Sequence, residues 1–252
     1  MDNLEFEKEI SQTSIEEFEK NLSNFFDFNG DINGTAYLNW RFDNSKVITS
    51  QMCEMGKAYY ETALNLLDTC LENNSDKKAD SWIFPILFHT VHGIEVYLKG
   101  FNSQIKTLEL LSKKQKYEVF GIEGTHNILQ LLQTALSRFD KYTRDNKYLT
   151  SQEEVKKIRK KINFIKKFIK ILYENTDDMT FARYPVTSKK ELQFYNNDSD
   201  YATYNNITID LHIYKIWLCK IFSILDEITG FCEYKIEEQM EYLVEIQNYN
   251  YE

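Results

Sequence analysis

Two prolines and eight glycines in 252 residues are the feature that most constrains how this chain folds. A β-sandwich or a β-barrel needs many tight turns, and glycine and proline supply most of the backbone conformations that such turns require. Apolar residues make up 42% of the chain and aromatic residues 15%, which is enough material for a packed core. We therefore expect an all-α protein with long helices and few interruptions.

Apolar residues recur at helical spacing through several stretches. Residues 151–174 give the clearest case, because five aliphatic side chains fall within about an 80° arc when each residue turns the helix by about 100°. These side chains are Ile158, Ile162, Ile165, Ile169 and Leu172. The same spacing predicts further helices over about 45–72, 81–100, 103–118, 125–139, 209–230 and 233–247. The sequence favours an up-and-down helical bundle.

The ends of these helices and the domain limits follow from capping and breaking residues. We expect Ser14, Asp80 or Ser81, and Thr125 as N-caps, Gly230 as a C-cap, and a late start or a kink at Pro85. The chain then divides into an N-terminal helical extension (1–44), a bundle (45–232), and an acidic helix with a tail (233–252). A short irregular or hairpin insertion is expected near 176–208.

Nothing in the sequence predicts a membrane or an export route. No apolar stretch approaches the roughly 18 residues of a membrane span, and the acidic start MDNLEFEKEI lacks the features of a signal peptide. The four cysteines form no C-x-x-C pair and are expected to be reduced thiols. The chain is therefore predicted to be cytoplasmic.

His89, His92 and Glu95 are spaced three residues apart within residues 81–100. Adjacent members lie about 60° apart around a helix, so pairs of them can converge. Imidazole and carboxylate ligands suit zinc or iron, but the surrounding apolar residues equally favour structural or substrate-contacting histidines. Glu95 and Lys99 also form a favourable i, i+4 pair. No pair of histidines at i, i+4 is present, and we predict no metal and no other cofactor.

His126 and His212 are both expected in the first turn of a helix. In the stretch GTHNI, His126 would lie beside exposed backbone amides, an arrangement that suits an anion. The alternative for His126 is an ordinary surface residue, and for His212 a structural role.

The segment KKIRKKINFIKKFIK, residues 156–170, carries eight positive charges and no negative charge. The net charge of −9 includes these eight, so the rest of the chain carries −17. Such a helix can follow phosphates, with Phe164 and Phe168 available for stacking, or it can dock against acidic surfaces. The predicted nucleic-acid contacts are Lys156, Lys157, Arg159, Lys160, Lys166, Lys167, Lys99 and Tyr184.

The stretch FARYP, residues 181–185, places an isolated arginine between aromatic residues and one of the two prolines. Arg183 there suits planar recognition of a phosphate or a carboxylate; the alternative is stacking on Tyr184 with an acidic partner. No Walker loop, dinucleotide-binding loop or nucleophile elbow is present, which argues against nucleotide hydrolysis and hydride transfer.

The order of these pieces resembles the HEPN superfamily over about residues 45–230. Members share an apolar helix with an E-x-x-L-K-like end, which HGIEVYLKG matches through Glu95 and Lys99. A G-H-x-L-like helix start follows, matched loosely by GTHNILQLL with Thr125 inserted, and several members carry an R-Y-P tripeptide, matched at Arg183.

This resemblance implies a helical bundle, often a homodimer, in bacterial antiviral defence, abortive-infection or toxin–antitoxin systems with an operon-encoded partner. Catalytic members are metal-independent ribonucleases with an Arg, four to six residues and a His. No arginine of this chain has a histidine at that spacing. Either activity is lost, or Arg183 works with a distant histidine such as His212, His89 or His126.

Three functions follow from these observations. The first is an atypical or non-catalytic HEPN-like protein that binds RNA, a nucleotide or a partner protein. The second is a metal-independent ribonuclease toxin with a rearranged site, with catalytic candidates Arg183, His126, His92, His89 and Glu95. The third is a metal-dependent helical-bundle enzyme.

Overall fold

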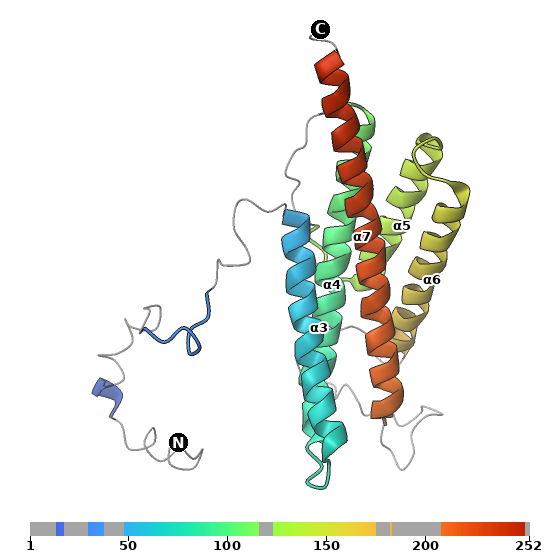
Figure 1. Cartoon of the computed structure of the whole chain (residues 1–252). Helices are drawn as coiled ribbons and strands as arrows, with labels where there is room; N and C mark the ends of the chain where they lie inside the picture. The colour runs from blue at the N-terminus through green and yellow to red at the C-terminus, as the bar shows by residue number, and fades with distance from the viewer. Residues whose placement is uncertain are drawn as a thin grey trace. The chain divides into compact units, whose positions relative to one another are not determined.

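The computed structural model describes residues 14–17, 30–37, 48–115, 123–174, 182 and 208–249. The chain divides into two units, Met1–Asn44 and Ser45–Glu252. The described residues of the second unit form α3 (Ile48–Glu72), α4 (Ala79–Ser112), α5 (Ile128–Asp145), α6 (Gln152–Glu174) and α7 (Leu211–Tyr249) (Figure 1). No strand occurs among the described residues, and the predicted all-α helical bundle is confirmed.

Helix α4 lies at the centre of the bundle, in contact with α3, α5 and α7. The Tyr214 hydroxyl of α7 donates to Thr90 of α4 at 2.8 Å, and Gln104 of α4 donates to Glu233 of α7 at 3.3 Å. The residue numbers rise together along both helices, so α4 and α7 run in the same direction. Helix α3 packs beside α4 and runs the opposite way, as its colour gradient shows (Figure 1).

Helices α4 and α5 also run in the same direction. Glu95 of α4 contacts His126 just before α5, and Glu109 of α4 contacts Lys141 of α5. Two consecutive helices with parallel directions interrupt the strict up-and-down alternation that the sequence suggested. As a result, the start of α5 lies beside the middle of α4, and α5 and α6 form a separate hairpin (Figure 1).

Close contact between α3 and α4 depends on glycine. A Cβ atom on Gly56 would lie 2.5 Å from the Tyr97 ring, and one on Gly93 would lie 2.9 Å from the Phe222 ring. Gly100 also faces α3, where an added Cβ atom would lie 3.4 Å from the Met52 side chain, an ordinary contact distance. The expected break between helices 81–100 and 103–118 is wrong, because α4 continues through Gly100 from Ala79 to Ser112.

The aliphatic stripe of α6 is confirmed as its core face. The four isoleucines of the stripe are at most 4% exposed, and Leu172 is partly buried against the core. The helix begins with a capping box. The Glu154 amide donates to the Ser151 hydroxyl at 3.2 Å, and the Ser151 amide donates to the Glu154 carboxylate at 2.8 Å. The lysines are thereby left on the outer faces of α6, where the sequence placed them.

Two predicted helix starts are wrong. Helix α5 is capped by Asn127, whose side chain accepts the Gln130 amide at 2.9 Å, and not by Thr125. Helix α4 begins at Ala79, with Pro85 inside it, so the late start is also wrong. The Ala79 amide donates to the side chain of Asn74 at 2.9 Å, in place of a cap by Asp80 or Ser81.

The predicted helix end at Gly230 is wrong as well. Helix α7 continues from Leu211 to Tyr249, so the expected bundle and the acidic segment 233–252 share one helix. Gly230 has open space around its Cβ position and no positive φ, so nothing there forces the helix to end. Core contacts on both sides of it, at Ile228 and Cys232, hold the helix across this point.

Other predictions fall mainly outside the described residues. In the N-terminal unit the Glu17 amide donates to Ser14 at 3.3 Å, as expected for a cap, but most of 1–44 is not described. Of the expected insertion at 176–208, only Ala182 and residue 208 are described, and Ala182 is buried.

No helix in the described part of the chain is both long and apolar enough to cross a membrane. The 39-residue α7 is long enough to cross a membrane but is not apolar enough, because charged residues recur along its whole length.

Candidate functional site

The first candidate site surrounds Glu95, at the middle of α4. One carboxylate oxygen, Oε1, lies 2.8 Å from both Lys99 Nζ and His126 Nδ1. Glu95 and Lys99 are one helical turn apart, and His126 reaches the same oxygen from the segment before α5. The Glu95 side chain is 4% exposed and that of Lys99 is 10% exposed, whereas that of His126 is 72% exposed. This cluster therefore joins a buried ion pair to an accessible imidazole.

Burial raises the pKa of Glu95, but the hydrogen bonds from Lys99 and His126 outweigh burial and hold the pKa below its ordinary value. Glu95 is therefore a carboxylate near neutral pH. A carboxylate that accepts from Nδ1 fixes the tautomer in which Nε2 of a neutral imidazole is the basic nitrogen. Because His126 is mostly exposed, this nitrogen can accept a proton from a bound molecule.

His89 and His92 lie in aromatic surroundings. The His92 ring stacks on Phe88, with centroids 5.6 Å apart, and meets the edge of Tyr59 at 4.6 Å. Nδ1 of His89 is buried and has no hydrogen-bond partner among the described residues. Burial, followed by the neighbouring charge of His92, lowers the pKa of His89. Both rings therefore contribute packing, and only His92 comes near Glu95, with Nδ1 3.7 Å from Oε2.

The alternative of a metal site at His89, His92 and Glu95 finds no support in the geometry of these side chains. Among the described residues, no group of three or more His, Cys, Asp or Glu side chains is arranged to hold a metal ion. His89 points its ring towards Tyr59 and Phe88, while Glu95 is occupied by Lys99 and His126.

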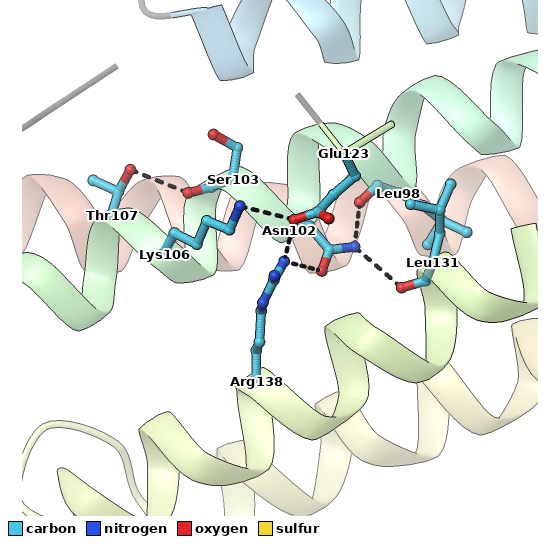
Figure 2. A network of polar contacts seen from close by, with 8 residues as sticks. All are labelled: Leu98, Asn102, Ser103, Lys106, Thr107, Glu123, Leu131 and Arg138. Carbon is cyan, nitrogen blue, oxygen red and sulfur yellow. Dashed lines mark hydrogen bonds and ion pairs between the residues drawn. The ribbon is translucent and has the colours of Figure 1, made fainter. Parts of the chain in front are cut away.

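A second polar network lies about two turns beyond Glu95 along α4, at Asn102 (Figure 2). Asn102 is fully buried; its amide donates to the carbonyls of Leu98 and Leu131, at 2.8 and 3.1 Å. Arg138 of α5 donates to Asn102 at 2.9 Å and to Glu123 at 2.7 Å. This network ties α5 to α4.

Glu123 is the shared acceptor of that network. Lys106 lies 2.8 Å from the same oxygen that Arg138 contacts, as Figure 2 shows. The hydrogen bond from Lys106 lowers the pKa of Glu123, burial opposes it, and Arg138 lowers it further. Both cations are therefore neutralised within the fold, and their role is structural.

The second candidate site is a groove of about 1060 Å³ between the C-terminal half of α5 and the N-terminal half of α6. Six cations line it, with one acidic side chain, Asp140, which Arg159 contacts at 2.6 Å. The cations are Arg144, Lys147, Lys156, Arg159, Lys160 and Lys167. Phe164 completes the wall nearest α7, where it stacks on Trp217 with centroids 5.1 Å apart.

Four of these cations have no ion-pair partner among the described residues. Lys147, Lys156, Lys160 and Lys167 are exposed and form no ion pair within the described part of the chain. On α6, Lys156, Lys160 and Lys167 fall within about a 40° arc and span about 16 Å. They form one stripe that faces the groove.

The predicted nucleic-acid contacts thus divide into two groups. Lys156, Arg159, Lys160 and Lys167 line the groove. Lys157 instead forms an exposed ion pair with Glu153 at 2.8 Å, and Lys99 is committed to Glu95. Lys166 is partly buried and does not line the groove.

Arg183 and Tyr184 lie outside the described residues, so the predicted meeting of Arg183 with the histidines stays a prediction. His212 is exposed at the start of α7. The groove and the Glu95 cluster lie at opposite ends of α5, about 20 Å apart by the rise of the helix.

Sequence reasoning missed the α5 side of the groove and the network at Asn102. Arg144 and Lys147 recur three residues apart, a spacing that places two cations on one face and that was available as a signal. Asn102, an amide within an apolar helix, was a signal of a buried polar contact.

Comparison of the chain with family models, with curated proteins and with solved structures found no match. The resemblance to the HEPN superfamily accordingly stays an expectation.

Proposed function

We propose that this chain is an atypical HEPN-like protein of a bacterial antiphage or toxin–antitoxin system that binds RNA in the groove between α5 and α6. The observation that carries the proposal is the set of four exposed lysines that line the groove without an acidic partner among the described residues. The chain has a net charge of −9, so acidic side chains outnumber basic ones. A cluster of unneutralised cations in such a chain favours a polyanionic ligand.

The alternatives to RNA have less support. A single nucleotide would engage two or three of the six cations, four of which are spread along about 16 Å of α6. An acidic partner protein would use the same charges, but it would not need the aromatic wall at Phe164. In this proposal the protein acts in the cytoplasm, as a homodimer and with an operon-encoded partner, as the resemblance implies.

Binding of a labelled single-stranded RNA, followed by fluorescence anisotropy over a range of salt concentrations, tests the proposal. The triple variant Lys156→Ala, Lys160→Ala, Lys167→Ala removes the three lysines of α6 that face the groove. If each lysine contacts one phosphate, the salt slope falls by about 2 and affinity at 0.1 M salt falls about a hundredfold.

A charge-matched control removes three exposed lysines outside the groove, Lys57, Lys113 and Lys220. We expect this control to bind nearly as tightly as the wild type. Equal losses in the two triple variants would show that net charge and not the groove drives binding. Absence of salt-dependent binding by the wild-type protein would remove the proposal.

A metal-independent ribonuclease is a second candidate, favoured by the contact between Glu95 and His126. In that reaction Nε2 of His126 takes the proton of a ribose 2′-hydroxyl. The 2′-oxygen then bonds to phosphorus, and the 5′-oxygen leaves with a proton from solvent. Glu95 acts as a positioning residue, because its contact with Nδ1 orients the ring of His126.

Cleavage of labelled tRNA in the presence of EDTA tests this candidate. Activity that is lost in His126→Gln, reduced in Glu95→Gln and retained in His212→Gln supports it, because His212 is an exposed histidine outside the cluster. Absence of cleavage at high protein concentration, or equal cleavage by all three variants, contradicts it.

A further inference from the structure

The groove between α5 and α6 combines cations with one aromatic side chain. Phe164 lies on α6 between Lys160 and Lys167, about 40° around the helix from Lys160. It is partly buried and lines the groove, and its ring is held by Trp217 of α7, with planes 13° from parallel. Phe168 stacks on the same Trp217 but is only 4% exposed, so it belongs to the core.

We infer that the groove selects single-stranded over double-stranded RNA by stacking one base on Phe164. This inference rests on the proposed RNA-binding function of the groove. A base in a duplex is already stacked on both faces and paired, whereas an unpaired base can turn towards an aromatic side chain.

The geometry of the groove supports a preference for single-stranded over double-stranded RNA. The lysines of α6 that face the groove lie on both sides of the Phe164 ring, Lys156 and Lys160 towards the N-terminus and Lys167 towards the C-terminus. A single strand can place phosphates at these cations and turn the base between them to Phe164. Trp217 fixes the ring in advance, so little side-chain freedom is lost on binding.

A rigid duplex meets the same groove differently. Its phosphates can contact the exposed lysines, but its bases stay inside the helix and cannot reach Phe164. Duplex RNA therefore retains the salt-dependent part of the binding energy and lacks the stacking part.

The experiment compares three probes at one salt concentration: a labelled single-stranded 12-mer, the blunt duplex of the same sequence, and inorganic polyphosphate, which carries charge but no bases. We expect the wild type to bind the single strand at least fivefold more tightly than the duplex. In Phe164→Leu, which keeps an apolar side chain, affinity for the single strand falls about fivefold or more. Affinity for the duplex and for polyphosphate stays the same.

Tyr242→Leu is the matched control, because Tyr242 is an exposed aromatic residue of α7 outside the groove. It should bind all three probes as the wild type does. Circular dichroism of Phe164→Leu checks that the fold is intact, and unchanged polyphosphate binding provides the same check at the groove itself.

The outcomes separate this inference from the proposed function. Equal affinity for single strand and duplex, or a preference for the duplex, overturns the stacking inference while the lysine-dependent binding stands. An equal loss for all three probes in Phe164→Leu also overturns it, because the ring would then only support the groove. No binding of any RNA by the wild type overturns both.

Discussion

The two ends of α5 hold basic side chains in different surroundings. Near the N-terminal end, Glu95 is shared by Lys99 and His126, and Glu123 is shared by Lys106 and Arg138. Near the C-terminal end, exposed lysines line an open groove, and those that line it form no ion pair with described residues. Cations at the first end are used to hold α5 against α4. The lysines at the second end remain available to a ligand, whereas Arg159 is paired with Asp140.

This difference shows how the role of a basic residue in such a chain can be inferred from its surroundings. Lys99 and Lys160 are both lysines on helices with apolar stripes, and the sequence assigned both to RNA. The first is 10% exposed and faces a carboxylate, whereas the second is exposed and faces a groove. The position of the nearest carboxylate decides between a structural and a binding role.

The largest effect on stability is expected from Glu95→Gln. The substitution keeps the shape of the side chain but leaves the Lys99 ammonium with no carboxylate in a largely buried position. Breaking such a buried pair should lower the free energy of unfolding by about 2–4 kcal/mol, measured by urea denaturation. Glu153→Gln is the control, because Glu153 and Lys157 form a pair of the same spacing and length on the surface. We expect no measurable change there, and equal effects would erase the distinction between buried and exposed pairs.

The pair of Glu95 and Lys99 also predicts that the free energy of unfolding depends on pH. Because the folded-state pKa of Glu95 lies below the ordinary value of 4.5, its contribution to stability is fully present above pH 4.5. It is lost as the pH falls through the lower folded-state pKa. The difference in unfolding free energy between wild type and Glu95→Gln should therefore be constant from about pH 6 to 7 and shrink below 4.5. If the difference in unfolding free energy grew below pH 4.5, the lowered pKa of Glu95 would be contradicted.

Replacing either of two arginines, Arg138 or Arg159, by alanine should have an intermediate or small effect on the free energy of unfolding. Arg138→Ala leaves the buried side-chain oxygen of Asn102 without this donor and leaves Glu123 with Lys106 alone, which should cost about 1–3 kcal/mol of unfolding free energy. Arg159→Ala removes a half-exposed contact to Asp140 and should cost no more than about 0.5 kcal/mol. Thermal unfolding of the two variants side by side checks the order. The reverse order would place the structural contacts at the groove.

The smallest effect on stability is expected from the triple variant at Lys156, Lys160 and Lys167. These side chains are exposed and lack acidic partners among the described residues, so removing them breaks no ion pair there and relieves repulsion between like charges. The melting temperature should be unchanged or slightly higher, although RNA affinity falls. A clear loss of stability would show that the stripe supports the fold.

Local patterns predicted the fold class and the core face of α6. The isoleucine spacing identified that face because a helix repeats its directions every 3.6 residues. The lysines of 156–167 were placed on its outer side for the same reason. Prediction failed where a residue had two roles: Gly100 and Gly230 are helix-breaking residues in isolation, yet α4 and α7 continue through them.

The candidate sites were predicted only in part. Residues close in sequence, such as Glu95 and Lys99, were paired correctly because their spacing alone brings them together. The contact of His126 with Glu95 spans 31 residues and depends on the parallel arrangement of α4 and α5, which no local pattern encodes.

By itself the sequence determined a helical protein with a cationic face on one helix, because the periodicity of apolar and charged residues is a property of the local chain. The tertiary structure decided which charges are neutralised. It placed Glu123 beside Lys106 of α4 and Arg138 of α5, and it paired α5 with α6 to form a groove around the remaining lysines. That choice depends on distances between helices, which are set by how side chains fill the core and not by spacing along the chain.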